Sequence, residues 1–134
     1  MKFLSKLLVM ISVVLIFSFY VSAHEMGGAK IPEKAKKAKN PVKADDKSIR
    51  RGKELYKTNC LMCHGEKGDG KGEIAAQLKE KPANFTDKHM MREMTDGEIF
   101  YIISKGEDLM PAWEGKLKEN ERWDLINYIK TFAK

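Results

Sequence analysis

The chain has 134 residues and a formal net charge of +6, with 43% hydrophobic and 33% charged residues. This length leaves room for one domain and little more. Two cysteines can form at most one bridge, which excludes a small protein held together by several disulfides. Four prolines and ten glycines exclude collagen-like and proline-rich fibrous chains.

Residues 1–23 have the pattern of a secretory signal peptide. Lys2 and Lys6 give a positive start, an apolar run of 15 residues follows, and the segment ends in small residues at Ala23. We expect cleavage after Ala23 and a mature chain outside the cytoplasmic membrane, in the periplasm. A retained membrane anchor is the alternative, although the run is short for a spanning helix, which needs about 20 apolar residues.

Residues 24–45 are predicted to be a lysine-rich flexible linker. They contain six lysines, two prolines and two glycines, and almost no large apolar side chain. Such a segment cannot bury enough surface to offset the entropy lost on ordering, although a transient helix over 33–39 is compatible with it. The lysines of residues 30–43 could make weak contact with an anionic membrane or an acidic partner, but a solvated spacer is favoured.

Most of the positive charge lies outside the predicted domain, which spans residues 46–134. Residues 1–23 carry +2 and residues 24–45 carry +3, so the domain itself has a net charge of +1. A nucleic-acid-binding domain is expected to carry a basic stripe on its folded face. None is evident, so we exclude nucleic acid as a partner.

The domain is predicted to be all-α, with four short helices and long loops. Asp46 or Ser48 should cap the first helix. Thr95 and Glu98 form a capping box for the third helix, which Gly106 ends. Apolar periodicity and these signals place the helices at about 46–59, 73–78, 95–105 and 119–132. Because four short helices give a thin core, a large apolar cofactor is expected to complete it.

The motif that indicates this cofactor is Cys60-Leu61-Met62-Cys63-His64, a C-x-x-C-H pattern for covalent haem attachment. Two thiols at this spacing face the same way and can each add to one haem vinyl group. The imidazole of His64 can then bind the iron, while its other ring nitrogen donates to a backbone carbonyl. The alternatives are a thioredoxin-type dithiol, a zinc site and a structural disulfide.

Met110 is the predicted sixth ligand of the iron. It lies in a loop after Gly106, and Pro111 stiffens the backbone beside it. A histidine–methionine pair raises the reduction potential relative to two histidines. An open sixth position is an alternative, and the rival side chains are those of His89, Met90, Met91 and Met94.

With these residues in place, the domain resembles class I cytochromes c, in the branch of periplasmic carriers and haem subunits of bacterial oxidoreductases. The resemblance rests on the segments RGKELYKTNCLMCHG, GDGKG, MTDGEIFYIISKG, MPAW and ERWDLINYIKTF. It implies one haem c, bound through Cys60 and Cys63, with His64 and Met110 as axial ligands. It also implies that the haem pocket is lined by Phe85 and Trp113.

The resemblance further implies how the first and last helices meet. Gly52 and Tyr56 are expected to cross the last helix near Leu125 and Tyr128. In the related branch a proline after GDGKG often supplies the carbonyl that accepts the histidine proton. This chain has Glu73 there, whose carbonyl could serve.

The expected function is single-electron transfer by Fe(III)/Fe(II) cycling, without enzymatic activity. Such a carrier binds redox-partner proteins transiently through small interfaces. One alternative is a haem subunit of a larger oxidoreductase, which a retained anchor or an exposed apolar patch near Trp113 would favour. Another is a ligand-binding or peroxidase-like haem protein with an open sixth position. A monomer and a subunit of a complex are both compatible with the sequence.

Overall fold

The computed structural model describes residues 30–134, so the predicted signal peptide lies outside the described residues. The elements in chain order are α2 (Glu33–Lys36), α3 (Asp46–Asn59), α4 (Leu61–His64), the 3-10 turn η1 (Ala75–Gln77), α5 (Lys88–Glu93), α6 (Asp96–Lys105), α7 (Glu119–Ile129) and the 3-10 turn η2 (Lys130–Ala133). The described part contains no strand, only an isolated bridge between Glu107 and Met110. The predicted all-α fold is therefore confirmed, but the helix predicted over 73–78 is only the 3-10 turn η1, and the described part has more than the four helices expected. Within residues 30–134, no helix has the length and apolar character needed to span a bilayer.

Two helices begin at aspartate caps that the sequence analysis did not identify. Asp45, rather than Asp46 or Ser48, caps α3, and its carboxylate accepts the backbone N–H of Ser48 at 2.9 Å. Helix α5 was not predicted. Its cap is Asp87, whose carboxylate accepts two backbone N–H groups of the first turn. A helix of six residues is too short to show apolar periodicity, so the cap is its main signal.

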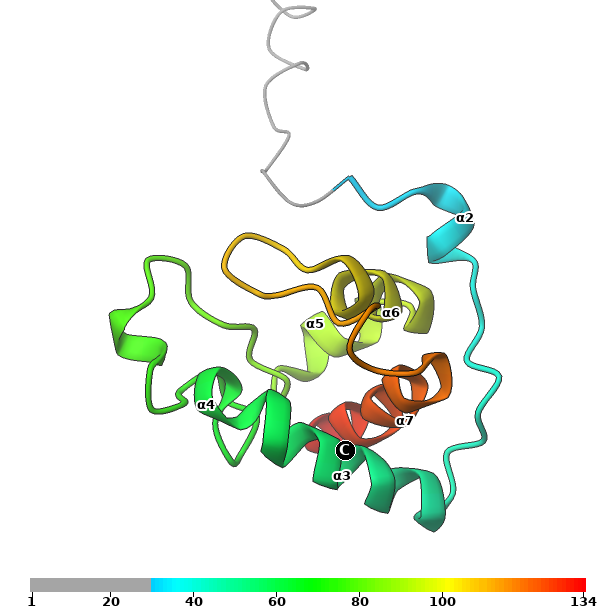
Figure 1. The fold of residues 1–134 in the computed structure, drawn as a ribbon, viewed down its shortest axis with the longest axis horizontal. Coiled ribbons are helices and arrows are strands. Elements are labelled where there is room, and N and C mark those ends of the chain that lie inside the picture. Colours follow the sequence, from blue (N-terminus) through cyan, green and yellow to red (C-terminus); the bar gives the residue numbers. More distant parts are fainter. Residues whose placement is uncertain (1–29) are drawn as a thin grey trace, which may run out of the picture.

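Helices α3 and α7 cross at Gly52, as the resemblance implied (Figure 1). A Cβ atom at Gly52 would lie 2.1 Å from the carbonyl oxygen of Asp124 and 2.9 Å from the Cβ of Tyr128. One turn further along α3, the ring of Tyr56 lies 5.3 Å from that of Tyr128. The absence of a side chain at position 52 lets the two backbones touch, and the tyrosines pack beside the contact.

A polar network that the sequence did not reveal stabilises the same crossing. Asp124 is 1% exposed and accepts from Ser48 Oγ at 2.6 Å. Arg51 adds two bonds to the same carboxylate, at 2.7 and 2.8 Å. Asn127 donates to Ser48 Oγ at 2.8 Å. Because each buried group here has a partner, the network can hold α3 and α7 in register without leaving an unpaired charge.

Residues 31–42 form a strap that lies along one side of the fold, from α2 towards the start of α3 (Figure 1). Asn40 donates to Asn127 Oδ1 at 2.8 Å, and Asn127 donates to the carbonyl of Val42 at 3.1 Å. At the other end, a Cβ atom at Gly97 would lie 1.9 Å from the carbonyl oxygen of Ala35. Ala38 and Val42 also pack against the apolar core, so polar, backbone and apolar contacts together hold a segment that was expected to be a flexible linker.

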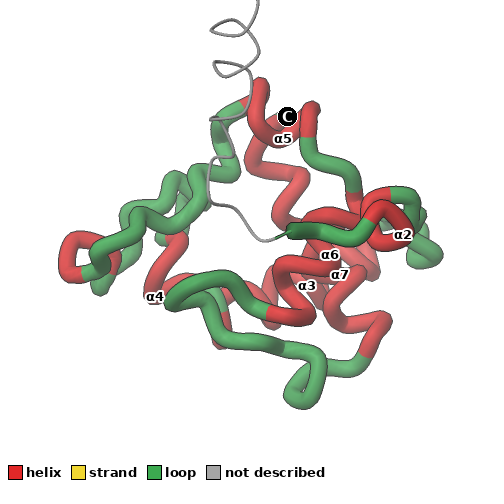
Figure 2. The backbone as a smooth tube through the Cα atoms, turned by 90° about the horizontal axis from the view of Figure 1, so that it is seen from above, coloured by secondary structure: helices red, strands yellow, loops and turns green. Residues whose placement is uncertain are grey.

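The apolar core lies between α3, α5, α6 and α7. In Figure 2, α3, α6 and α7 group together, while the long loop between α4 and α5 extends away from them. The buried core residues are Tyr56, Met91, Ile99, Ile103, Trp123, Leu125, Ile126 and Ile129. The loops therefore carry little of the core. Of the predicted site residues, Phe85, Met110 and Trp113 lie in loops, whereas Cys60, Cys63 and His64 belong to the helical turn at the end of α3.

Candidate functional site

The C-x-x-C-H motif forms one helical turn immediately after α3. Cys60 is both the C-cap residue of α3 and the N-cap residue of α4. Its carbonyl accepts the N–H of Cys63 at 3.2 Å and that of His64 at 2.9 Å. Gly65 then ends the turn with a φ of +79°. The structure thus brings both thiols and the imidazole into a single turn, as the motif requires for attachment to one haem.

The state of the two cysteines disfavours the alternative sites. Both thiols are free, so they form no structural disulfide. Burial, with a smaller contribution from Cys63, raises the pKa of the Cys60 thiol to about 12, whereas a redox-active dithiol needs a lowered pKa. The described residues also contain no group of three or more His, Cys, Asp or Glu side chains placed to hold a metal ion.

The imidazole of His64 is buried and oriented by a backbone carbonyl. Its Nδ1 lies 3.2 Å from the carbonyl oxygen of Ala83, which can only accept, so Nδ1 carries the proton and donates it. Burial lowers the pKa of His64 and outweighs the opposing effect of this bond. The ring is therefore neutral, and Nε2 keeps the lone pair that an iron ligand needs. The acceptor is Ala83 and not Glu73, the residue that the sequence analysis considered.

Phe85 packs directly on His64. The two ring centroids are 4.5 Å apart and the planes differ by 19°. The backbone N–H of Phe85 donates to the carbonyl of Gly68 at 2.7 Å, which fixes the aromatic ring beside the loop that follows α4. Phe85 thus restrains the imidazole, and its predicted role in lining the haem pocket stays a prediction.

The GDGKG loop folds back over the attachment turn. Gly70 N–H donates to the carbonyl of His64 at 2.9 Å, and Gly72 N–H donates to that of Cys63 at 3.0 Å. A Cβ atom at Gly72 would lie 2.2 Å from the carbonyl oxygen of Met62. Glycine is needed here because the loop backbone touches the end of α4, and its N–H groups satisfy carbonyls that a helix end leaves unpaired.

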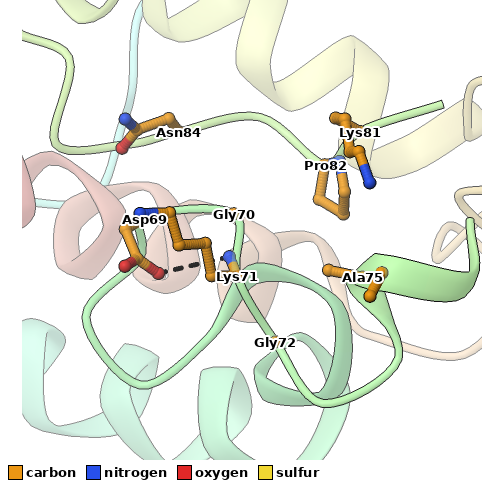
Figure 3. A pocket seen from close by; sticks show the side chains of 9 residues that line it. Asp69, Gly70, Lys71, Gly72, Ala75, Lys81, Pro82 and Asn84 are labelled. Carbon is orange, nitrogen blue, oxygen red and sulfur yellow. Dashed lines mark hydrogen bonds between the residues drawn. The ribbon is translucent and has the colours of Figure 1, made fainter.

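A cavity of about 500 Å³ lies between this loop and the segment that carries the His64 acceptor (Figure 3). The six predicted site residues do not line it. Its wall includes Asp69, whose carboxylate accepts the backbone N–H of Lys71 at 3.2 Å. The remaining lining residues are Gly70, Gly72, Ala75, Ala76, Lys81, Pro82 and Asn84.

Met110 lies in a loop that begins and ends at the last turn of α6. Gly106 opens the loop with a φ of +74°. Met110 N–H donates to the carbonyl of Glu107 at 2.8 Å, and Trp113 N–H returns to the carbonyl of Ile103 at 3.1 Å. Figure 1 shows this loop, yellow to orange, above α4, which is green. The loop is therefore a tight, internally bonded turn that can hold a side chain in place.

The rival ligands occupy different positions. Met91 is 5% exposed and belongs to the apolar core. The side chain of His89 is 74% exposed and lies 3.4 Å from the carboxylate of Glu93. Met90 and Met94 are partly buried against the core, and so are Met110 and Trp113. Met91 and His89 are accordingly poorly placed as ligands, and Met110 stays the predicted one.

The residues around the motif fit a covalently bound haem. The thiols share a turn, the histidine has its Nε2 free, and a methionine loop follows α6. Ala83 was missed because it acts through its backbone carbonyl, which every residue has, so the residue type gives no signal. Only the contact in the folded chain identifies it.

Comparison with known proteins finds cytochromes and cytochrome oxidase subunits. Residues 47–129 match the family described as "Cytochrome C oxidase, cbb3-type, subunit III". The cbb3-type cytochrome c oxidase subunit FixP of Bradyrhizobium diazoefficiens is 35% identical over 84 residues, which cover 62% of this chain and 27% of FixP. Cytochrome c6 of Chlorolobion braunii is 31% identical over 83 residues, which cover 58% of this chain and 83% of that protein.

A solved structure shares the fold. It is a chain of the reducing HAO-like protein complex of Kuenenia stuttgartiensis, with a TM-score of 0.62 and 25% sequence identity over 70% of this chain and 47% of that chain. This chain thus spans about a quarter of FixP and about half of that structure. Since the family match runs from α3 to α7 and includes the C-x-x-C-H turn, this chain belongs to the cytochrome c family, whose members bind haem c covalently and transfer electrons.

Proposed function

We propose that the protein is a monohaem electron carrier that works outside the cytoplasmic membrane and exchanges single electrons with redox-partner proteins. Cys60 and Cys63 would hold the haem through thioethers, and His64 and Met110 would be the ligands of its iron. The observation that carries the proposal is the bond from His64 Nδ1 to the Ala83 carbonyl, at 3.2 Å. It selects the tautomer that a haem ligand needs.

The bound haem supplies one-electron chemistry between Fe(III) and Fe(II). The chain contributes a rigid setting for it. The carbonyl of Ala83 and the ring of Phe85 restrain His64 from two sides. The closed turn around Met110 presents a thioether sulfur, a soft ligand that favours the reduced metal. Because His64 and Met110 both lie in segments whose backbone is held by hydrogen bonds, these side chains would need to move little when a bound haem gains or loses an electron.

The electron is proposed to leave through a surface near two exposed apolar side chains. Met62 is 49% exposed within the attachment turn, and Leu109 is 62% exposed beside Met110. A small apolar contact of this kind suits brief binding to a redox partner. The exposed lysines of the strap, Lys34, Lys37 and Lys39, are proposed for weak contact with an anionic membrane or an acidic partner.

A haem subunit of a larger oxidoreductase is the second candidate. The exposure of Leu109, close in sequence to Trp113, is the apolar surface that such a subunit would bury. FixP is named as an oxidase subunit, and the matched solved chain comes from a protein complex. Size-exclusion chromatography of the native protein separates the two candidates, because co-elution with a large partner would contradict a free carrier.

Replacing Met110 with alanine tests the axial assignment. The Met110→Ala protein should lose the sulfur-to-iron charge-transfer band of the ferric state, and its reduced state should bind carbon monoxide. The matched control is Met94→Ala, which shortens a partly buried rival methionine and should keep the band. A band that survives in Met110→Ala but disappears in Met94→Ala would move the assignment to Met94.

A further inference from the structure

Arg122 is a buried cation on α7 to which the proposed electron transfer gives no role. It is 6% exposed, and its guanidinium carbon lies 4.6 Å from the ring centroid of Phe100. One of its Nη atoms donates to Ser104 Oγ, while its buried Nε has no hydrogen-bond partner among the described residues. None of the ion pairs between described residues includes it. A guanidinium held so incompletely is costly to bury.

The partner of Arg122 lies where the Met110 loop is fastened. Ser104 is the last residue but one of α6, and its carbonyl accepts the N–H of Glu114 at 3.1 Å. The preceding carbonyl, of Ile103, accepts the N–H of Trp113. Both ends of the loop that carries Met110 therefore attach to the final turn of α6, and Arg122 binds this turn from α7.

The position also suits a positive charge. The carbonyl end of α6 carries partial negative charge, which a nearby cation stabilises. The neighbouring charges are Lys105 and Glu114, which pair at 2.5 Å. That pair lowers the pKa of Glu114, with a smaller contribution from Arg122 itself. The guanidinium thus lies against the helix end, a hydroxyl and an aromatic face, which offset part of the cost of burying it without an ion pair among the described residues.

We propose that Arg122 is a positioning residue for the Met110 loop. By holding Ser104 and the last turn of α6, it limits the opening of the segment that presents the sulfur to the iron. This inference rests on the proposed role of Met110 as ligand. The inference goes beyond that role, because it gives Arg122, a residue of α7, the task of keeping the Met110 loop closed.

The test uses the haem-loaded protein and the variants Arg122→Met and Ser104→Ala. Loss of a hydrogen bond to a charged group should speed amide hydrogen exchange at Trp113 and Glu114 about tenfold. Carbon monoxide should bind the reduced variants with a rate about tenfold higher, because the loop opens more often. Ser104→Ala is the second variant in case the methionine does not fit the space of the guanidinium.

The control is Arg51→Met, which breaks the bidentate pair with buried Asp124 at the α3–α7 crossing. It should lower global stability without raising carbon monoxide binding or exchange at Trp113 beyond the global effect. Unchanged exchange in both Arg122→Met and Ser104→Ala would overturn the proposal, and so would equal loop opening in Arg51→Met. Failure of the Met110→Ala test would remove the ligand assignment alone, because amide exchange reports the loop whichever residue binds the iron.

Discussion

Replacing Gly52 with alanine tests the contact on which the α3–α7 crossing depends. The new Cβ would lie 2.1 Å from the carbonyl oxygen of Asp124 and 2.7 Å from its carbonyl carbon. Ordinary contacts between such heavy atoms are about 3.5 Å, so the helices would have to separate by about 1.4 Å along this contact. The obstacle is backbone, which cannot rotate out of the way as a side chain could.

The expected loss of stability is large for a single methyl group. Overpacking a core typically costs about 1–3 kcal/mol, and a clash with backbone places Gly52→Ala near the upper end, at about 3 kcal/mol. For a domain of about 60–100 residues, this corresponds to a fall in Tm of about 12–24 °C. The separation would also strain the bond from Tyr56 Oη to the Gly65 carbonyl, now 2.7 Å, which ties the crossing to the attachment turn.

The assay is urea unfolding of the haem-loaded protein, followed by far-ultraviolet circular dichroism. Gly115→Ala is the matched control, because a Cβ atom there would have nothing within 4 Å. It should change the free energy of unfolding by no more than about 0.5 kcal/mol. If Gly52→Ala differed from this control by less than about 1 kcal/mol, the close approach of the two helices would be refuted.

Two further predictions concern the edges of the fold. Gly97→Ala should displace the strap, because its Cβ would lie 1.9 Å from the Ala35 carbonyl oxygen. Trypsin should then cut the strap at its lysines faster than in the wild type. A loss of stability as large as that of Gly52→Ala would contradict a peripheral strap. Asp45→Ala should destabilise α3 at neutral pH, because the cap bond to Ser48 N–H holds the pKa of Asp45 below its ordinary 3.8. The stability gap between wild type and Asp45→Ala should therefore shrink as the pH falls below 3.8, and a gap that does not change with pH would argue against the charged cap.

Helix ends with reciprocal signals could be predicted from the sequence. Thr95 and Glu98 form both bonds of their capping box, at 2.8 and 3.2 Å. Gly106 ends α6 with a positive φ that glycine adopts easily. The first helix could be placed at its C-terminal end but not at its cap, because three neighbouring residues, Asp45, Asp46 and Ser48, all have capping side chains. Only the backbone direction decides between them.

The strap could not be predicted because its contacts carry no compositional signal. Asn40 and Asn127 are 87 positions apart, and each is a common surface residue on its own. The carbonyl of Ala35 meets Gly97 only because α2 and the start of α6 come together in the fold. The local pattern therefore predicted a flexible segment, whereas the structure places residues 31–42 in contact with the rest of the fold.

The site was predictable to the extent that its chemistry lies in side chains. The C-x-x-C-H spacing indicated a shared helical turn, which the structure has. The acceptor of the His64 proton could not be assigned from the sequence. The resemblance offered only the residue after GDGKG, whereas the carbonyl that meets the ring is that of Ala83, 19 positions from His64. With this many residues between the motif and the acceptor, no local sequence pattern identifies which carbonyl meets the histidine.

The distribution of buried apolar side chains explains why this sequence needs a group from outside itself. Of the nine buried apolar residues in the described chain, only Ala75 falls within 57–90 or 104–122. Those two segments carry every predicted site residue, and together they hold the attachment turn and the Met110 loop. Their backbones are fixed by hydrogen bonds and glycine contacts rather than by a core of their own. A haem held by Cys60 and Cys63 would supply the missing apolar surface to these segments, and His64 and Met110 would be the side chains offered to its iron.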